Sequence, residues 1–282
     1  MSVVGPLLAF GSALAYAGFD ATRKQAGLHL HPLSLTAWLQ VVSLPFYGAW
    51  AAVVGWHLEA TWWGAGVVSI LLQASANALF LWALVLAPLS RTVPFLALTP
   101  VLSGLAAWAL LGETPTPRAL AGMALVTLGA FALAVVRGHD GVRVERGSVL
   151  VVIVAALWSA GGAVDKAALV YAHPASHAMV VALGTLLLFG LERGLRKGKA
   201  GLQVPRAAWL PLLSAGLIGC LAMGLQLSAY AWTFVSTVET IKRAVGGFAA
   251  LALGRLAFGE TIEPRSLLAV LVMSVGTLLV LT

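Results

Sequence analysis

The strongest constraint on the fold is a series of apolar runs of about 20 residues, the length that crosses a hydrocarbon layer of about 30 Å as an α-helix. Short polar connections separate the runs from one end of the chain to the other. Charged residues make up only 10% of the 282 residues, against roughly 25% in soluble domains. So few charges cannot cover a water-facing surface, and the alternating pattern of a membrane β-barrel is missing. The sequence therefore predicts an all-α integral membrane protein.

Ten transmembrane helices can be placed. Proline fits the first turn of a helix, where its missing N–H would have no partner anyway, and four prolines mark such starts: Pro32, Pro117, Pro174 and Pro264. We expect Pro94, Pro100 and Pro211 to kink their helices by removing backbone hydrogen bonds. The predicted spans are 3–22, 33–55, 62–86, 92–111, 117–136, 147–168, 175–193, 207–232, 240–258 and 264–281.

The two halves of the chain carry the same marks in the same order. A shift of 142 residues places Lys24 on Lys166. A shift of 147 residues places the Gly-Glu-Thr turn at 112–114 on the Gly-Glu-Thr turn at 259–261. Coincidences at both ends of a half, at nearly one offset, indicate an internal duplication.

We expect the duplicated units to be residues 1–140 and 146–282, with five spans in each. Because five is odd, the second unit enters the membrane from the opposite side, which gives two inverted five-helix repeats. This architecture is typical of secondary transporters, whose halves move about a site near the bilayer midplane.

These features give the chain a family resemblance. With its duplicated five-span unit, its Gly-Glu-Thr turn after the fourth span of each half and its stretch 239–260, it resembles the EamA family of the drug/metabolite transporter superfamily. The resemblance covers essentially the whole chain. It implies alternating access and a central cavity lined by spans 1, 3, 4, 6, 8 and 9, with spans 5 and 10 as scaffold. Members carry amino acids, metabolites, cations or drugs, so the resemblance leaves the solute open.

Basic residues predict the orientation, because cytoplasmic loops of membrane proteins are enriched in them. The connections after odd-numbered spans hold 13 of the 17 Lys and Arg residues. This distribution predicts that these connections are cytoplasmic and that both termini lie outside, whereas the family resemblance implies both termini inside. The net charge of +7 is explained by these loops, and no nucleic-acid partner is expected.

Polar side chains inside apolar spans are costly and mark candidate functional positions. The motif VETIKR places Glu239, Lys242 and Arg243 near the start of the ninth span. Glu239 and Arg243 are four residues apart on one helical face, where they could pair. The group either binds an anionic or zwitterionic solute, or carries a proton, or is a cluster at a helix end whose charges neutralise one another.

Matched polar positions in the two halves predict a wet cavity. Gln73 and Asn77 share one face of the third span, and Gln226 and Tyr230 share one face of the eighth. These side chains either line a cavity for the solute or join helices through hydrogen bonds.

Aromatic residues fall into two groups. Tyr16 and Trp158 match across the repeat at mid-span positions, where they either pack or contact the solute by stacking on it or holding a cation. We expect Trp62, Trp63 and Trp209 to belong to the aromatic belt at the membrane surface.

Charges at the ends of the first and sixth spans are candidates for gating or proton coupling. Asp20 and Lys24 form an i, i+4 pair with the acid first, and Asp165 and Lys166 lie at the matching depth. The alternative is that these are ordinary charges at loop edges. We expect Glu113 to accept hydrogen bonds from the N–H groups at the start of the next helix.

Together these features predict a secondary transporter of a small organic solute (an amino acid, metabolite or drug) that acts as an exporter or facilitator by alternating access. A membrane-embedded enzyme would need clustered His, Asp or Glu in the spans, and a non-transporting bundle has little use for matched polar helices. No nucleotide-binding motif is present, and we expect no cofactor and no metal site. The expected location is the inner (plasma) membrane, where the protein would be a multi-pass monomer or homodimer whose partners are the lipid bilayer and a small-molecule substrate.

Overall fold

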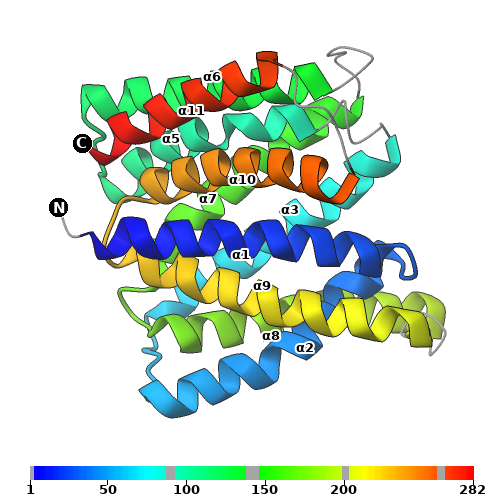
Figure 1. Ribbon diagram of the computed structural model, residues 1–282. Coiled ribbons are helices and arrows are strands. Elements are labelled where there is room, and N and C mark those ends of the chain that lie inside the picture. The colour runs from blue at the N-terminus through cyan, green and yellow to red at the C-terminus, as the bar shows by residue number, and fades with distance from the viewer. Residues whose placement is uncertain (1–2, 87–92, 138–145, 199–202, 259–263) are drawn as a thin grey trace.

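The computed structural model describes residues 3–86, 93–137, 146–198, 203–258 and 264–282. Within these ranges ten α-helices form one bundle, and both termini lie at the same end of it (Figure 1). Two short 3₁₀ segments, η1 (Val93–Leu98) and η3 (Arg206–Ala208), precede α-helices. The α-helices are α1 (Val4–Gly27), α2 (Pro32–Val54), α3 (Trp62–Leu86), α5 (Thr99–Leu111), α6 (Pro117–Arg137), α7 (Arg146–Ala168), α8 (Pro174–Lys197), α9 (Trp209–Tyr230), α10 (Val235–Phe258) and α11 (Pro264–Leu281).

All ten predicted spans are confirmed as helices, and seven of the described helices are long and apolar enough to cross a membrane: α1, α2, α3, α7, α8, α9 and α11. The proline kinks are predicted less well. Pro100 and Pro211 lie in the first turns of α5 and α9, where a helix has no N–H bond for proline to remove. Pro94 lies in η1, so the fourth span starts as a 3₁₀ segment rather than as a bent α-helix. Pro45, for which no kink was expected, lies inside α2.

The contacts between helices repeat across the two halves. Helix α1 packs against α9 and α10, and its counterpart α7 packs against α3 and α5, which are the counterparts of α9 and α10. The pairs α2–α8, α5–α10 and α6–α11 each join a helix to its own counterpart. This pattern is the one expected of a bundle built from two related five-helix units.

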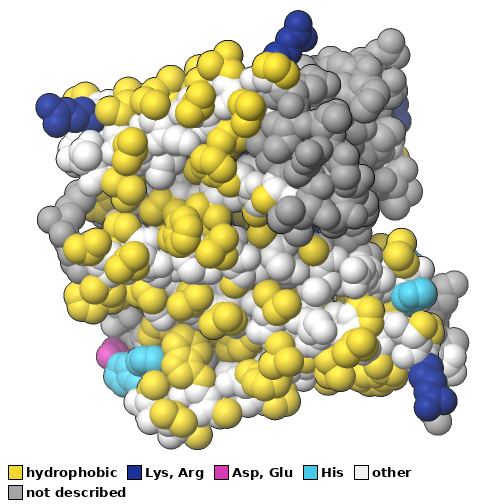
Figure 2. All heavy atoms as spheres, viewed as in Figure 1, with side chains coloured by type: hydrophobic (Ala, Val, Ile, Leu, Met, Phe, Trp, Pro, Cys, Tyr) yellow, Lys and Arg dark blue, Asp and Glu magenta, His cyan; other side chains and the backbone are white. Residues whose placement is uncertain are grey.

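The outer surface is apolar. Figure 2 shows hydrophobic side chains spread over the visible face, with Lys, Arg, Asp, Glu and His side chains near its edges. Trp63 and Trp209 are exposed, as residues of an interfacial belt would be. Trp62 is fully buried, so the prediction that it belongs to the belt is wrong. The reason lies in its contact with α8, described below.

Histidine caps the start of α8 and makes the stability sensitive to pH. The Nδ1 atom of His173 accepts a hydrogen bond from the backbone N–H of Ala175 at 3.2 Å. Partial burial, and secondarily the neighbouring His57, lower the pKa of His173 below its usual value of 6.5. Because the unfolded chain takes up the proton at a higher pH than the folded chain, this stabilisation is present above the unfolded pKa and is lost as the pH falls through the folded pKa.

We therefore expect the melting temperature of the protein in detergent to fall between about pH 8 and about pH 5, where an ordinary histidine titrates. In His173→Asn the amide oxygen keeps a cap acceptor that does not titrate, so the decrease should be smaller. Thermal melts of both proteins across this range test the prediction. Identical pH profiles would show that His173 does not contribute.

Candidate functional site

Five of the predicted solute-contacting residues meet in one network formed by α1, α9 and α10. The Nζ atom of Lys242 donates to Glu239 Oε1 at 2.8 Å and to Gln226 Oε1 at 2.6 Å. Gln226 in turn donates from Nε2 to the hydroxyl of Tyr230 at 2.9 Å. The Lys242 ammonium lies 4.6 Å from the centroid of the Tyr16 ring. The network therefore joins one helix of the first half to two helices of the second.

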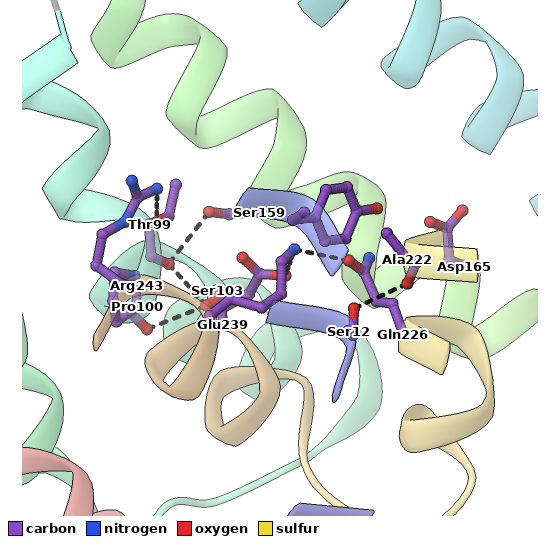
Figure 3. Close-up of polar contacts among 12 residues, drawn as sticks. Ser12, Thr99, Pro100, Ser103, Ser159, Asp165, Ala222, Gln226, Glu239 and Arg243 are labelled. Carbon is purple, nitrogen blue, oxygen red and sulfur yellow. Dashed lines mark hydrogen bonds and ion pairs between the residues drawn. The ribbon is translucent and has the colours of Figure 1, made fainter. Parts of the chain in front are cut away.

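Arg243 is not part of this network. The expected pair between Glu239 and Arg243 is not formed, because Lys242 occupies the carboxylate and is held there by its second acceptor on α9. The Nη2 atom of Arg243 instead donates to Thr99 Oγ1 on α5 at 2.8 Å. In Figure 3 Arg243 and Asp165 lie on opposite sides of the residues Glu239 and Gln226.

A second polar group, on α3, α7 and α8, is centred on Asp165. Its carboxylate is buried, accepts a hydrogen bond from the Ser69 hydroxyl and another from Gln73 Nε2 at 3.3 Å, and lies 3.3 Å from His177 Nε2. The Nδ1 atom of His177 accepts from the indole N–H of Trp62 at 3.0 Å. Asp165 and Gln73 were predicted as site residues, whereas Ser69 and His177 were not and Trp62 was expected in the aromatic belt. His177, three residues after the first-turn proline of α8, gave no signal of burial in the sequence.

A cavity of about 80 Å³ lies beside this group. Its apolar wall includes Met223 and Leu227 of α9. Its polar lining comes from four helices: Gln40, Tyr47, Gln73, Asn77, Asp165, His177 and Thr185. Within the described ranges, no three His, Cys, Asp or Glu side chains come together as metal ligands would. The cavity can thus hold a few water molecules or the polar head of a solute.

A third group closes the end of the bundle that carries both termini. The Nζ atom of Lys166 donates to Glu113 Oε1 at 2.5 Å and to the carbonyl oxygen of Thr233 at 2.8 Å. Glu113 Oε2 accepts from the backbone N–H of Val235, at the start of α10, at 3.1 Å. Glu113 therefore caps a helix of the other half and not, as expected, the helix that follows it. We call Glu113, Lys166, Thr233 and Val235 the terminal-side clamp.

Two other predicted residues lie away from these groups. Trp158 packs on Phe80 of α3 with ring centroids 5.3 Å apart, inside an apolar cluster. Asp20 is 61% exposed and pairs with Arg23 at 2.8 Å, while the expected pair with Lys24 stays a prediction. The side chain of Lys24 lies outside the described residues.

Comparisons with known proteins agree with this architecture. Residues 3–135 and 145–282 each match the EamA-like transporter family. A crystal structure of a protein with 18% sequence identity superposes with a TM-score of 0.83 over 99% of this chain and 96% of that chain, which shows a shared fold. No curated protein matches the chain. Because the two family matches together cover nearly all of its length, the chain is a multi-pass membrane protein that belongs to the EamA-like transporter family.

Proposed function

We propose that this protein is a secondary carrier that exports or facilitates passage of a small organic solute, such as an amino acid, a metabolite or a drug, across the inner (plasma) membrane. The observation that carries the proposal is the polar seam between the two halves. Tyr16 of the first half lies against Lys242 of the second, and Gln73 of the first half contacts Asp165 of the second. Polar groups are costly inside a membrane, so their concentration between the two halves supports a solute path there.

Alternating access would separate residues 1–140 from 146–282 at one end of the bundle at a time. The terminal-side clamp supports this mechanism, because it joins Glu113 of the first half to Lys166 and Val235 of the second. We propose it as the gate at this end, together with Asp165, the residue before Lys166 in α7. Lys24 matches Lys166 in the repeat, and the gating role of Asp20 and Lys24 at the other end of the bundle stays a prediction.

The solute would contact the Lys242 network and the polar cavity. The proposed contacts are the side chains of Tyr16, Gln73, Asn77, Gln226, Tyr230, Glu239 and Lys242. Arg243 and Trp158, which the structure does not join to either group, stay predictions as solute contacts.

Counterflow in proteoliposomes tests this function. Purified protein would be reconstituted with labelled amino acids, amines and organic acids, and the exchanged solute identified. Lys242→Gln combined with Glu239→Gln keeps the local charge at zero but removes the ion pair, and we expect it to lower the exchange rate roughly tenfold, which corresponds to about 1.4 kcal/mol. Ser274→Ala on α11, where the hydroxyl bonds its own helix, is the matched control and should exchange at the wild-type rate.

The rival functions give different results in the same assay. A membrane-embedded enzyme would convert a solute chemically without exchanging it. A non-transporting bundle would exchange none of the panel. An unchanged rate in the double variant, with exchange intact in the wild type, would remove the Lys242 network from the solute path.

A further inference from the structure

The cavity beside Asp165 contains a carboxylate. Among the described residues, its lining includes no lysine or arginine. Lys166, the next residue in the chain, points the other way, with its ammonium on Glu113 and on the Thr233 carbonyl. Within the described residues, the basic side chain that contacts Asp165 is His177. The charge on this buried carboxylate is therefore balanced by His177 or by something that enters the cavity.

His177 is not suited to supply that charge. Trp62 is fully buried, and its indole nitrogen can only donate a hydrogen bond. Because this N–H points at His177 Nδ1 from 3.0 Å, Nδ1 must keep its lone pair and the neutral ring carries its hydrogen on Nε2. That hydrogen faces Asp165 Oδ1. A second proton on the ring would sit on Nδ1, where its N–H would face the indole N–H of Trp62. His177 therefore acts as a neutral donor.

The remaining lining fits a cationic head group. A buried carboxylate without a counter-ion is strongly unfavourable, and a positively charged ligand would relieve this. An ammonium group has three N–H donors and no acceptor. Asp165, Gln40, Gln73 and Asn77 line the cavity, and each of these side chains carries an oxygen that can accept a hydrogen bond. Its volume of about 80 Å³ suits a head group, while Met223 and Leu227 form an apolar wall for the carbon chain behind it.

We propose that this cavity is the subsite for the ammonium group of an amine solute, with Asp165 as its counter-ion. The inference deepens the proposed carrier function and rests on it, since it names the chemical class of the solute. In this arrangement Ser69 and His177 position the carboxylate, and Trp62 positions His177. None of these three is required to touch the solute.

Binding to the full chain in detergent tests the inference separately from transport. The probes are butylammonium, butanol and butyrate at equal ionic strength, which share a carbon chain and differ in charge. We expect saturable binding of butylammonium alone, measured by calorimetry or by thermal stabilisation. Asp165→Asn should weaken it at least tenfold. Glu59→Gln, which removes an exposed carboxylate in the connection between α2 and α3, should bind as the wild type does.

A second variant keeps the inference testable if Asp165→Asn does not fold. Trp62→Phe leaves Asp165 in place but removes the indole donor, so His177 is free to take the second proton and to neutralise Asp165 itself. Butylammonium binding should then weaken roughly tenfold. Equal binding of butanol or butyrate to the wild type, or unchanged binding in both the Asp165 and the Trp62 variants, would overturn the inference.

The two proposals fail in different ways. Solute exchange in proteoliposomes without binding of any amine would overturn the ammonium subsite and leave the carrier function standing. Amine binding that depends on Asp165, without exchange of any solute, would support the subsite and overturn the carrier function.

Discussion

The single substitution Glu113→Gln is expected to destabilise the protein more than the double substitution of Glu113→Gln with Lys166→Met. Glu113 is 9% exposed and Lys166 25% exposed, and their charged atoms are 2.5 Å apart. Removing the negative charge alone leaves a largely buried ammonium with two neutral acceptors, the Thr233 carbonyl and the new amide oxygen, at a cost of roughly 3 kcal/mol. Removing both charges also removes the cost of taking the ammonium out of water, so the double variant should recover much of that loss.

Unfolding in mixed detergent, analysed as a double-mutant cycle, measures this coupling. The matched control is the pair of Asp20 and Arg23 at the opposite end of the bundle. Its charged atoms are also in contact, but they face water. Exposed pairs contribute about 1 kcal/mol or less, so Asp20→Asn should change little. A double variant as unstable as Glu113→Gln, or an equal loss in the control, would mean that the clamp does not act as a buried ion pair.

The contacts of the terminal-side clamp also predict an effect of Glu113→Gln on the exchange rate. Because Glu113 holds the start of α10 as well as Lys166, its loss frees two attachments between the halves at this end. We expect the variant to favour the conformation open at the terminal side, so that its exchange rate changes even at temperatures where it stays folded.

The spans could be predicted from the sequence because lipid imposes one rule on every residue in them. Hydrophobic length located each helix, and the first-turn prolines Pro32, Pro117, Pro174 and Pro264 located four starts. The same rule also located most polar residues of the site, since each is an exception to an apolar run. Gln73, Gln226 and Glu239 could be found in this way without knowledge of their neighbours.

Partners could not be predicted, because they depend on helices that are distant in the sequence. The i, i+4 rule pairs Glu239 with Arg243 on an isolated helix. In the folded protein Lys242 binds Glu239 instead, because Gln226 on α9 gives it a second acceptor. Arg243 donates to Thr99 on α5. Trp62 shows the same limit. At the end of an apolar run it has the sequence context of a belt residue, and its burial comes from α8, through His177.

Gly276→Ala is expected to reduce the folded protein severely, because α6 and α11 meet through their backbones. A Cβ atom on Gly276 would lie 2.6 Å from the carbonyl oxygen of Gly122 and 2.9 Å from the backbone nitrogen of Val126. Neither backbone atom can rotate away as a side chain would, so the helices must separate. In a membrane such helices are held mainly by close packing, and the separation also loosens the buried apolar cluster that includes Val126 and Met273.

We expect this substitution to cost about 3 kcal/mol, the upper part of the range for overpacked cores, and to lower both the melting temperature and the yield of monodisperse protein. Gly48→Ala, in the interior of α2, is the matched control, because a Cβ atom there meets nothing within 4 Å and alanine favours a helix over glycine by roughly 1 kcal/mol. The two variants add the same methyl group, so their difference isolates the close approach of the two backbones. If both melt like the wild type, α6 and α11 do not pack through Gly122 and Gly276, and the contact that joins the last helix of one half to the last helix of the other must lie elsewhere.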